Sequence, residues 1–145
     1  MGTSYTELFF MDEVTALASG HRPCFECRRA EAKEFAAAFS EGVSADEPMK
    51  ADDMDLVLHE DRLENGKPKR YSAAFESLPD AAMFIWQGQP HAARNSKALM
   101  WTPRGYEIPR IAISKASSVT VLTPACIVHA LSNGYAPTWH PTATA

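Results

Sequence analysis

A cysteine-containing loop lies near the N-terminus, in the sequence Gly20-His21-Arg22-Pro23-Cys24-Phe25-Glu26-Cys27-Arg28-Arg29. Cys24 and Cys27 have the Cys-x-x-Cys spacing that lets two sulfurs face one ion, each about 2.3 Å from it, as half of a tetrahedral zinc site. Gly20 can end a preceding helix in a left-handed conformation, and Pro23 stiffens the entry to the turn. The motif therefore predicts a metal-binding knuckle that supplies two of the four ligands a structural zinc site needs.

The segment from residue 8 to residue 28 resembles part of a known module. It combines aromatic residues that end a short strand, a short helix that ends at Gly20, and Arg-Pro-Cys-x-x-Cys-Arg. This order is similar to the second half of the zinc-binding domain of the Ada DNA repair protein, a domain also found appended to some nucleases. The resemblance implies that Cys24 and Cys27 correspond to the second pair of a four-cysteine zinc site.

The chain departs from that family at several positions. No cysteine precedes Leu8, so the first cysteine pair is missing, and the family's methyl-transfer activity, which uses an upstream cysteine, does not carry over. His21 stands where the family has Tyr or Phe, which favours packing of its ring, and Arg29 replaces a proline. The chain also looks like a group of uncharacterised bacterial proteins that begin further upstream, so a truncated chain with an incomplete metal site is one interpretation.

Any further zinc ligands have to come from outside the Cys-x-x-Cys motif. His21 lies three residues before Cys24 and can close a Cys2His arrangement. Cys126 and His129 are spaced i, i+3 on a predicted helix and can face one ion, although a cysteine at such a place is more often a small buried hydrophobe. Three more histidines have no partner at ligand spacing and are predicted to be structural or exposed: His59, His91 and His140.

Two other interpretations of the Cys-x-x-Cys motif stay open. A cytosolic Cys-x-x-Cys can be a redox pair, but the expected setting, after a strand and at the start of a long helix, is absent here. The motif can also form a metal-free structural turn. No phosphate-binding glycine loop and no nucleophile motif occurs in the chain. An enzyme is the alternative to a binding module, either a thiol- or metal-dependent one centred on Cys24 and Cys27 or a hydrolase built from dispersed histidines and acids.

Composition and charge limit the class of protein. The chain has 145 residues, of which 46% are hydrophobic, which is typical of one globular domain. No apolar run approaches the about 18 residues that a membrane span needs, and three cysteines favour a reducing cytoplasm over a disulfide framework. Residues 41–65 carry nine acids and two bases, net −7, whereas residues 66–145 carry eight bases and three acids, net +5. No basic patch is dense, so strong sequence-independent DNA binding is not indicated.

The N-terminal half reads mainly as helices. We expect a strand at 5–10, a helix capped by Asp12 and closed by Gly20, and a second helix over 29–39. An acidic connector at 40–50 leads to a third helix over about 52–63, for which a strand at 56–58 is the competing interpretation. Residues 64–70 are expected to form a loop.

The C-terminal half changes to a period of two. Five short strands are predicted, at 82–86, 90–94, 98–102, 108–113 and 118–122, with Trp86 and Trp101 packing across them. Thr123 is expected to cap a last helix, with Pro124 at its first position and Gly134 at its end. An extended tail follows from residue 135.

These patterns predict a small single α+β domain. Residues 1–40 form the strand–helix–knuckle–helix part, 41–72 an acidic connector and helix, and 73–145 a short-stranded antiparallel β meander closed by a C-terminal helix. The predicted role is a non-catalytic binding module with zinc at Cys24, Cys27 and His21. Its partner is expected to be nucleic acid or protein; for nucleic acid, the resemblance implies phosphate contacts by three arginines beside the knuckle, Arg22, Arg28 and Arg29.

Overall fold

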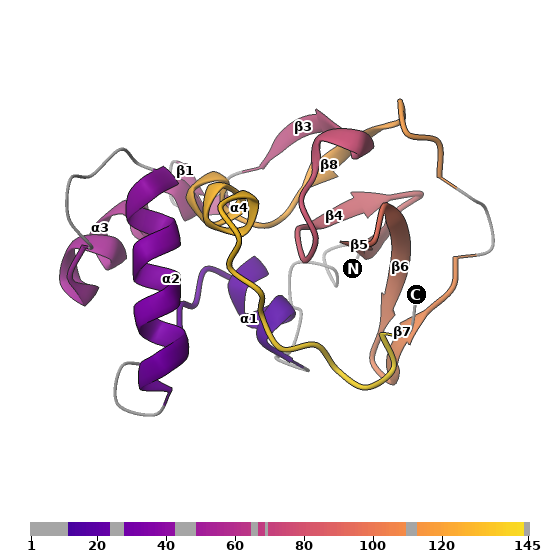
Figure 1. Ribbon diagram of the computed structural model, residues 1–145. Helices are drawn as coiled ribbons and strands as arrows, with labels where there is room; N and C mark the ends of the chain where they lie inside the picture. The colour runs from indigo at the N-terminus through magenta and orange to yellow at the C-terminus, as the bar shows by residue number, and fades with distance from the viewer. Residues whose placement is uncertain are drawn as a thin grey trace.

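The computed structural model describes residues 12–23, 28–42, 49–64, 67–68, 70–109 and 113–143. Four helices gather on one side of the molecule and a six-stranded sheet lies on the other (Figure 1). The helices and the 3-10 turn are α1 Glu13–Ala18, α2 Arg29–Gly42, α3 Ala51–Arg62, η2 Phe75–Ser77 and α4 Ala125–Ser132. The strands are β1 Leu63–Glu64, β2 Lys67–Pro68, β3 Tyr71–Ala74, β4 Met83–Trp86, β5 Gln89–Arg94, β6 Lys97–Thr102, β7 Gly105–Glu107 and β8 Ser118–Val121. The predicted small α+β single domain is confirmed.

Helix α1 has well-defined ends that its sequence predicts. The Thr15 amide donates to Asp12 Oδ1 at 3.0 Å and the Asp12 amide donates to Thr15 Oγ1 at 3.1 Å, which together form a capping box. At the other end Gly20 has φ 86°, and the His21 amide donates to the Ala16 carbonyl at 2.9 Å. This left-handed glycine stop directs the chain into the knuckle segment.

Helices α2 and α3 occupy the predicted positions, although α2 continues three residues beyond Phe39. In α3, Met54 and Leu58 are buried four residues apart, which is the spacing of one helix face. The alternative strand at 56–58 is therefore wrong. Helix α2 packs through Phe35, whose ring meets the Tyr135 ring edge-on at a centroid distance of 5.2 Å.

The sheet is antiparallel, with the strand order β3-β8-β4-β5-β6-β7. Strands β4, β5 and β6 form the expected part of a meander, which β7 continues. Strand β8, expected at 118–122, returns to lie between β4 and β3. The edge strands β3 and β7 have no counterpart in the sequence-based prediction, which therefore missed both edges of the sheet. The loop expected at 64–70 is wrong in part, because Glu64, Lys67 and Pro68 belong to the short antiparallel ladder of β1 and β2.

Two of the predicted strands do not appear in the described structure, for different reasons. The strand expected at 108–113 is wrong for its described residues, because β7 ends at Glu107 and Ile108 and Pro109 have no strand structure. Pro109 has no amide hydrogen to give to a ladder, and the side chain of Ile108 is 84% exposed, which no core strand position would show. The strand expected at 5–10 lies outside the described residues.

The core consists of two clusters of buried side chains. The larger cluster joins the helices to the sheet and includes Phe35, Phe39 and Trp101. The smaller cluster contains Phe75 and Phe84 with the half-buried Trp86 against it. Trp86 and Trp101 belong to different clusters, so the expectation that they pack across the meander is wrong.

Helix α4 begins one residue later than predicted. Its N-cap is Pro124, with φ −53° and ψ 143°, and not Thr123. The Thr123 hydroxyl instead accepts a hydrogen bond from the Met83 amide at 2.9 Å and so ties the helix to β4. Five residues of the helix are buried: Cys126, Ile127, Val128, Ala130 and Leu131.

Two tight turns join the central strands and allow a paired test. Gln87 and Gly88 have φ 54° and 71°, and Asn95 and Ser96 have φ 51° and 64°, so both loops have the two left-handed residues of a type I′ turn.

Ser96→Gly removes a left-handed side chain and is expected to raise the free energy of unfolding by about 0.5–1 kcal/mol. Gly88→Ala, whose new methyl would meet nothing within 4 Å, is expected to lower it by about 1 kcal/mol through strain alone. Urea unfolding measures the stability of both variants. A loss of stability in Ser96→Gly would contradict the assignment of a type I′ turn at Asn95 and Ser96.

His91 makes stability depend on pH. Its ring is buried, stacks on Phe84 at a centroid distance of 5.7 Å, and donates from Nδ1 to the Gln89 carbonyl at 2.8 Å, since a carbonyl only accepts. Burial lowers the pKa of His91 below its ordinary value of 6.5, against a smaller opposing effect of the Gln89 carbonyl. Below pH 6.5 the unfolded chain therefore binds more protons than the folded one. As the pH is lowered through this range, the free energy of unfolding decreases by at most about 1.4 kcal/mol per pH unit.

Urea unfolding at pH 8, 6.5 and 5 of wild type and His91→Phe isolates this contribution. Because all other titrating groups are common to both proteins, the wild type is expected to lose more stability than the variant between pH 6.5 and 5. Parallel pH profiles would show that His91 does not control this dependence.

Candidate functional site

The candidate site is the knuckle and the residues that hold its two ends. Cys24 and Cys27 lie outside the described residues, and the structure describes the chain up to Pro23 and again from Arg28. Arg22 and Arg28 stand on the two sides of the cysteine pair. Each makes contacts with a different element of the fold.

Arg22 attaches the entry of the knuckle to α3. Its Nε lies 2.8 Å from Asp55 Oδ1, and its Nη2 lies 3.1 Å from Asp55 Oδ2, so the guanidinium and the carboxylate form a two-pronged pair. A third nitrogen, Nη1, donates to the Pro23 carbonyl at 3.1 Å. Such a bidentate geometry fixes direction as well as distance.

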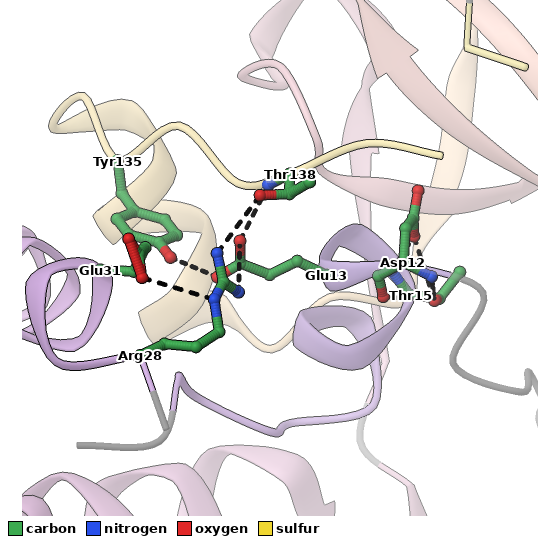
Figure 2. A network of polar contacts seen from close by, with 7 residues as sticks. All are labelled: Asp12, Glu13, Thr15, Arg28, Glu31, Tyr135 and Thr138. Atoms are coloured by element: carbon green, nitrogen blue, oxygen red, sulfur yellow. Dashed lines mark hydrogen bonds and ion pairs between the residues drawn. The ribbon is translucent and has the colours of Figure 1, made fainter. Parts of the chain in front are cut away.

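Arg28 attaches the exit of the knuckle to α1 and to the C-terminal tail (Figure 2). Its Nη1 lies 3.1 Å from Glu13 Oε1, and its Nη2 donates to the Thr138 hydroxyl at 3.3 Å. Its Nε lies 3.5 Å from Glu31 at the start of α2. The residue that directly follows Cys27 is thus held by three segments at once.

The centre of this network is the Glu13 carboxylate, whose side chain is only 6% exposed. Besides its ion pair with Arg28, this carboxylate accepts hydrogen bonds from the Tyr135 hydroxyl and from the Thr138 amide, the latter at 2.8 Å (Figure 2). Burial and the neighbouring Glu13 raise the pKa of Tyr135 above its ordinary value, so the phenol stays protonated and donates. The backbone amide of Glu13 in turn donates a hydrogen bond to the Thr138 carbonyl at 3.2 Å.

Asp12 makes a second set of contacts with the same tail. Its Oδ2 accepts the His140 amide at 2.8 Å, and its Oδ1 accepts the Tyr106 hydroxyl at 3.3 Å. Burial, followed by the charge and hydrogen bond of Asp12, raises the pKa of Tyr106. The Tyr106 amide donates to Thr142 Oγ1 at 2.8 Å, which fixes the end of the tail to β7.

The predicted site residues therefore have different environments. Arg22 and Arg28 are engaged in ion pairs within the chain, and Arg29 is exposed on the first turn of α2. His21 is also exposed, so the expectation that its ring packs in the core is wrong. The i, i+3 pair on α4 does not share an environment either, since Cys126 is 4% exposed and His129 is exposed.

Within the ranges that the structure describes, no three His, Cys, Asp or Glu side chains come together as a metal site. His21 is an exposed imidazole three residues from Cys24, and with two thiolates it is chemically a suitable zinc donor. A zinc ion at Cys24, Cys27 and His21 would bridge the chain between its two anchored ends.

Sequence reasoning missed Glu13, Tyr135 and Thr138. Glu13 follows the cap residue Asp12 and looks like an ordinary acidic residue of a first helical turn. Two of its partners, Tyr135 and Thr138, lie 122 and 125 residues away in the chain. No local sequence pattern indicates that Glu13 contacts Tyr135 and Thr138.

Comparison of the chain with protein-family models, with curated proteins and with solved structures finds no match. In the described part of the chain, no helix has the combination of length and apolar character needed to cross a bilayer. The function of the site is therefore argued from its own residues.

Two acids that pair with the same arginine give a matched test of the network. Glu13→Ala leaves Arg28 and the Tyr135 hydroxyl without their buried acceptor and is expected to lower the free energy of unfolding by about 3 kcal/mol. Glu31→Ala removes a pair whose carboxylate side is 40% exposed and is expected to cost under about 1 kcal/mol. Urea unfolding measures the free energy of unfolding of both variants. Equal losses in the two variants would show that Glu13 has no central role in the network.

Proposed function

We propose that this protein is a small non-catalytic binding module in which Cys24, Cys27 and His21 hold a structural zinc ion. The observation that carries the proposal is the anchoring of both sides of the cysteine pair. Arg22 fixes the entry to Asp55 of α3, and Arg28 fixes the exit to the buried Glu13. A metal loop needs such outer contacts to keep its ligands in place.

The charges around the knuckle favour a protein partner over nucleic acid. Arg22 and Arg28 each have a carboxylate against the guanidinium, so two of the three arginines predicted to contact phosphate are neutralised within the chain. Helix α3, which holds Arg22 through Asp55, also exposes three further acidic residues that would repel phosphates: Asp52, Asp53 and Glu60. Leu56 lies on the same helix with 66% of its side chain exposed, an apolar contact that a protein partner can cover.

Nucleic acid is the second candidate partner, and the exposed Arg29 favours it. Arg29 is the first residue of α2, where the helix dipole adds to the attraction for an anion. A cytoplasmic location belongs to the same proposal, because Cys24 and Cys27 have to stay reduced to bind zinc.

Zinc content tests the proposal. Protein purified without added metal is expected to hold about one zinc per chain by elemental analysis. The double variant Cys24→Ser/Cys27→Ser is expected to lose it, and Cys126→Ser, which changes the buried cysteine of α4, is the matched control and should keep it. A folded wild-type protein without zinc would contradict the proposal.

The zinc-loaded protein also separates the two partner classes. Labelled duplex and single-stranded oligonucleotides are expected not to bind at about 0.1 M salt, where contacts to a few phosphates are already weakened. Binding that is lost in Arg29→Gln would assign a nucleic-acid partner instead.

A further inference from the structure

A second concave site lies away from the knuckle, between η2, the turn at Asp80 and the hairpin that joins β5 to β6. The pocket has a volume of about 330 Å³. This is at the lower end of the range for small-molecule sites. Its lining residues belong to neither the network of Glu13 nor the knuckle.

The floor of the pocket is apolar and part of the protein core. Phe75 and Ala93 line it and are 4% and 3% exposed, as members of the smaller buried cluster. Leu78 lines it as well and is half-buried against the same cluster. An apolar group that enters the pocket would therefore meet an apolar surface that is already fixed by packing.

The mouth of the pocket carries charges of both signs. Glu76, Asp80 and Lys115 line it and are exposed. Asp80 Oδ1 accepts the Asn95 amide at 2.9 Å, which leaves Oδ2 available. Among the described residues, the side chains of Glu76 and Lys115 have neither a salt bridge nor a hydrogen bond, although both line one small space.

The walls are held by backbone hydrogen bonds. The Ala81 amide donates to the Ala93 carbonyl at 2.7 Å, and the Ala93 amide donates to the Ala82 carbonyl at 3.0 Å. On the other side the Glu76 amide donates to the Lys115 carbonyl at 3.0 Å. Ala81 has φ 78° although it is no glycine, which shows that the surrounding structure imposes this turn. The pocket is thus preformed, and a ligand need not order it.

We propose that this pocket binds a small zwitterion with an apolar side chain, in the chemical class of a free aliphatic α-amino acid. The carboxylates of Glu76 and Asp80 would receive the ammonium group, and the ammonium of Lys115 would receive the carboxylate. The apolar side chain would lie on Phe75, Leu78 and Ala93. The assignment rests on the match between two unpaired opposite charges at the mouth and an apolar floor beneath them.

The test is an NMR titration of the ¹⁵N-labelled full-length chain with leucine, with N-acetyl-leucine, which has no cation, and with leucinamide, which has no carboxylate. Leucine is expected to shift the amides of residues 75–78, 80, 93–96 and 115 with a dissociation constant on the order of 1 mM, as befits so small a ligand. Each derivative is expected to bind at least fivefold more weakly.

Variants locate the binding. Glu76→Gln should weaken leucine binding towards the level of N-acetyl-leucine, whose own affinity it should not lower. Lys115→Gln should likewise weaken leucine binding towards the level of leucinamide and should not lower the affinity of leucinamide. Lys33→Gln, an exposed lysine on α2, is the matched control and should leave leucine binding unchanged. Folding of each variant is checked in the same spectra. Absence of shifts at these amides at 20-fold the expected dissociation constant, or equal binding of all three compounds, would overturn the proposal.

Discussion

The Glu13 carboxylate joins α1, the exit of the knuckle and the tail after α4 in one place. It is buried, and a buried carboxylate is tolerated only when hydrogen bonds replace the water it has lost. Arg28, the Tyr135 hydroxyl and the Thr138 amide supply those bonds from the knuckle exit and from the tail (Figure 2). The position of α1, the direction of the tail after α4 and the end of the knuckle therefore depend on one side chain.

This arrangement gives the knuckle a particular role in the fold. The chain leaves α1 at a left-handed glycine, passes Arg22, and re-enters the helical layer at Arg28. Both arginines have their charges paired inside the molecule, so they act as supports of the loop and not as free cations. In the zinc-bound form that we propose, a metal ion between such supports would stabilise a shape that a partner can recognise, which is why we favour a binding module over an anion-binding surface.

Local patterns predicted most of the fold, and the misses have physical reasons. Capping residues and helical periodicity placed α1, α2 and α3, and alternation with tight turns placed β4, β5 and β6. Strand β3 was missed because Tyr71–Ala74 is short and its pairing with β8 spans almost fifty residues. Ile108 looked like a strand residue by type, but the neighbouring Pro109 cannot donate to a ladder. At the site, the sequence singled out the arginines by position, whereas their acidic partners became visible only in three dimensions.

We propose that Cys24, Cys27 and His21 share one zinc ion at the anchored knuckle. X-ray absorption at the zinc edge of the purified protein can test this, because it reports the kinds of ligand atom and their distances. We expect two sulfur ligands at about 2.3 Å and at least one imidazole nitrogen at about 2.0–2.1 Å, with the nitrogen signal reduced in His21→Ala. A shell of four sulfurs, or no bound zinc in a folded protein, would contradict it.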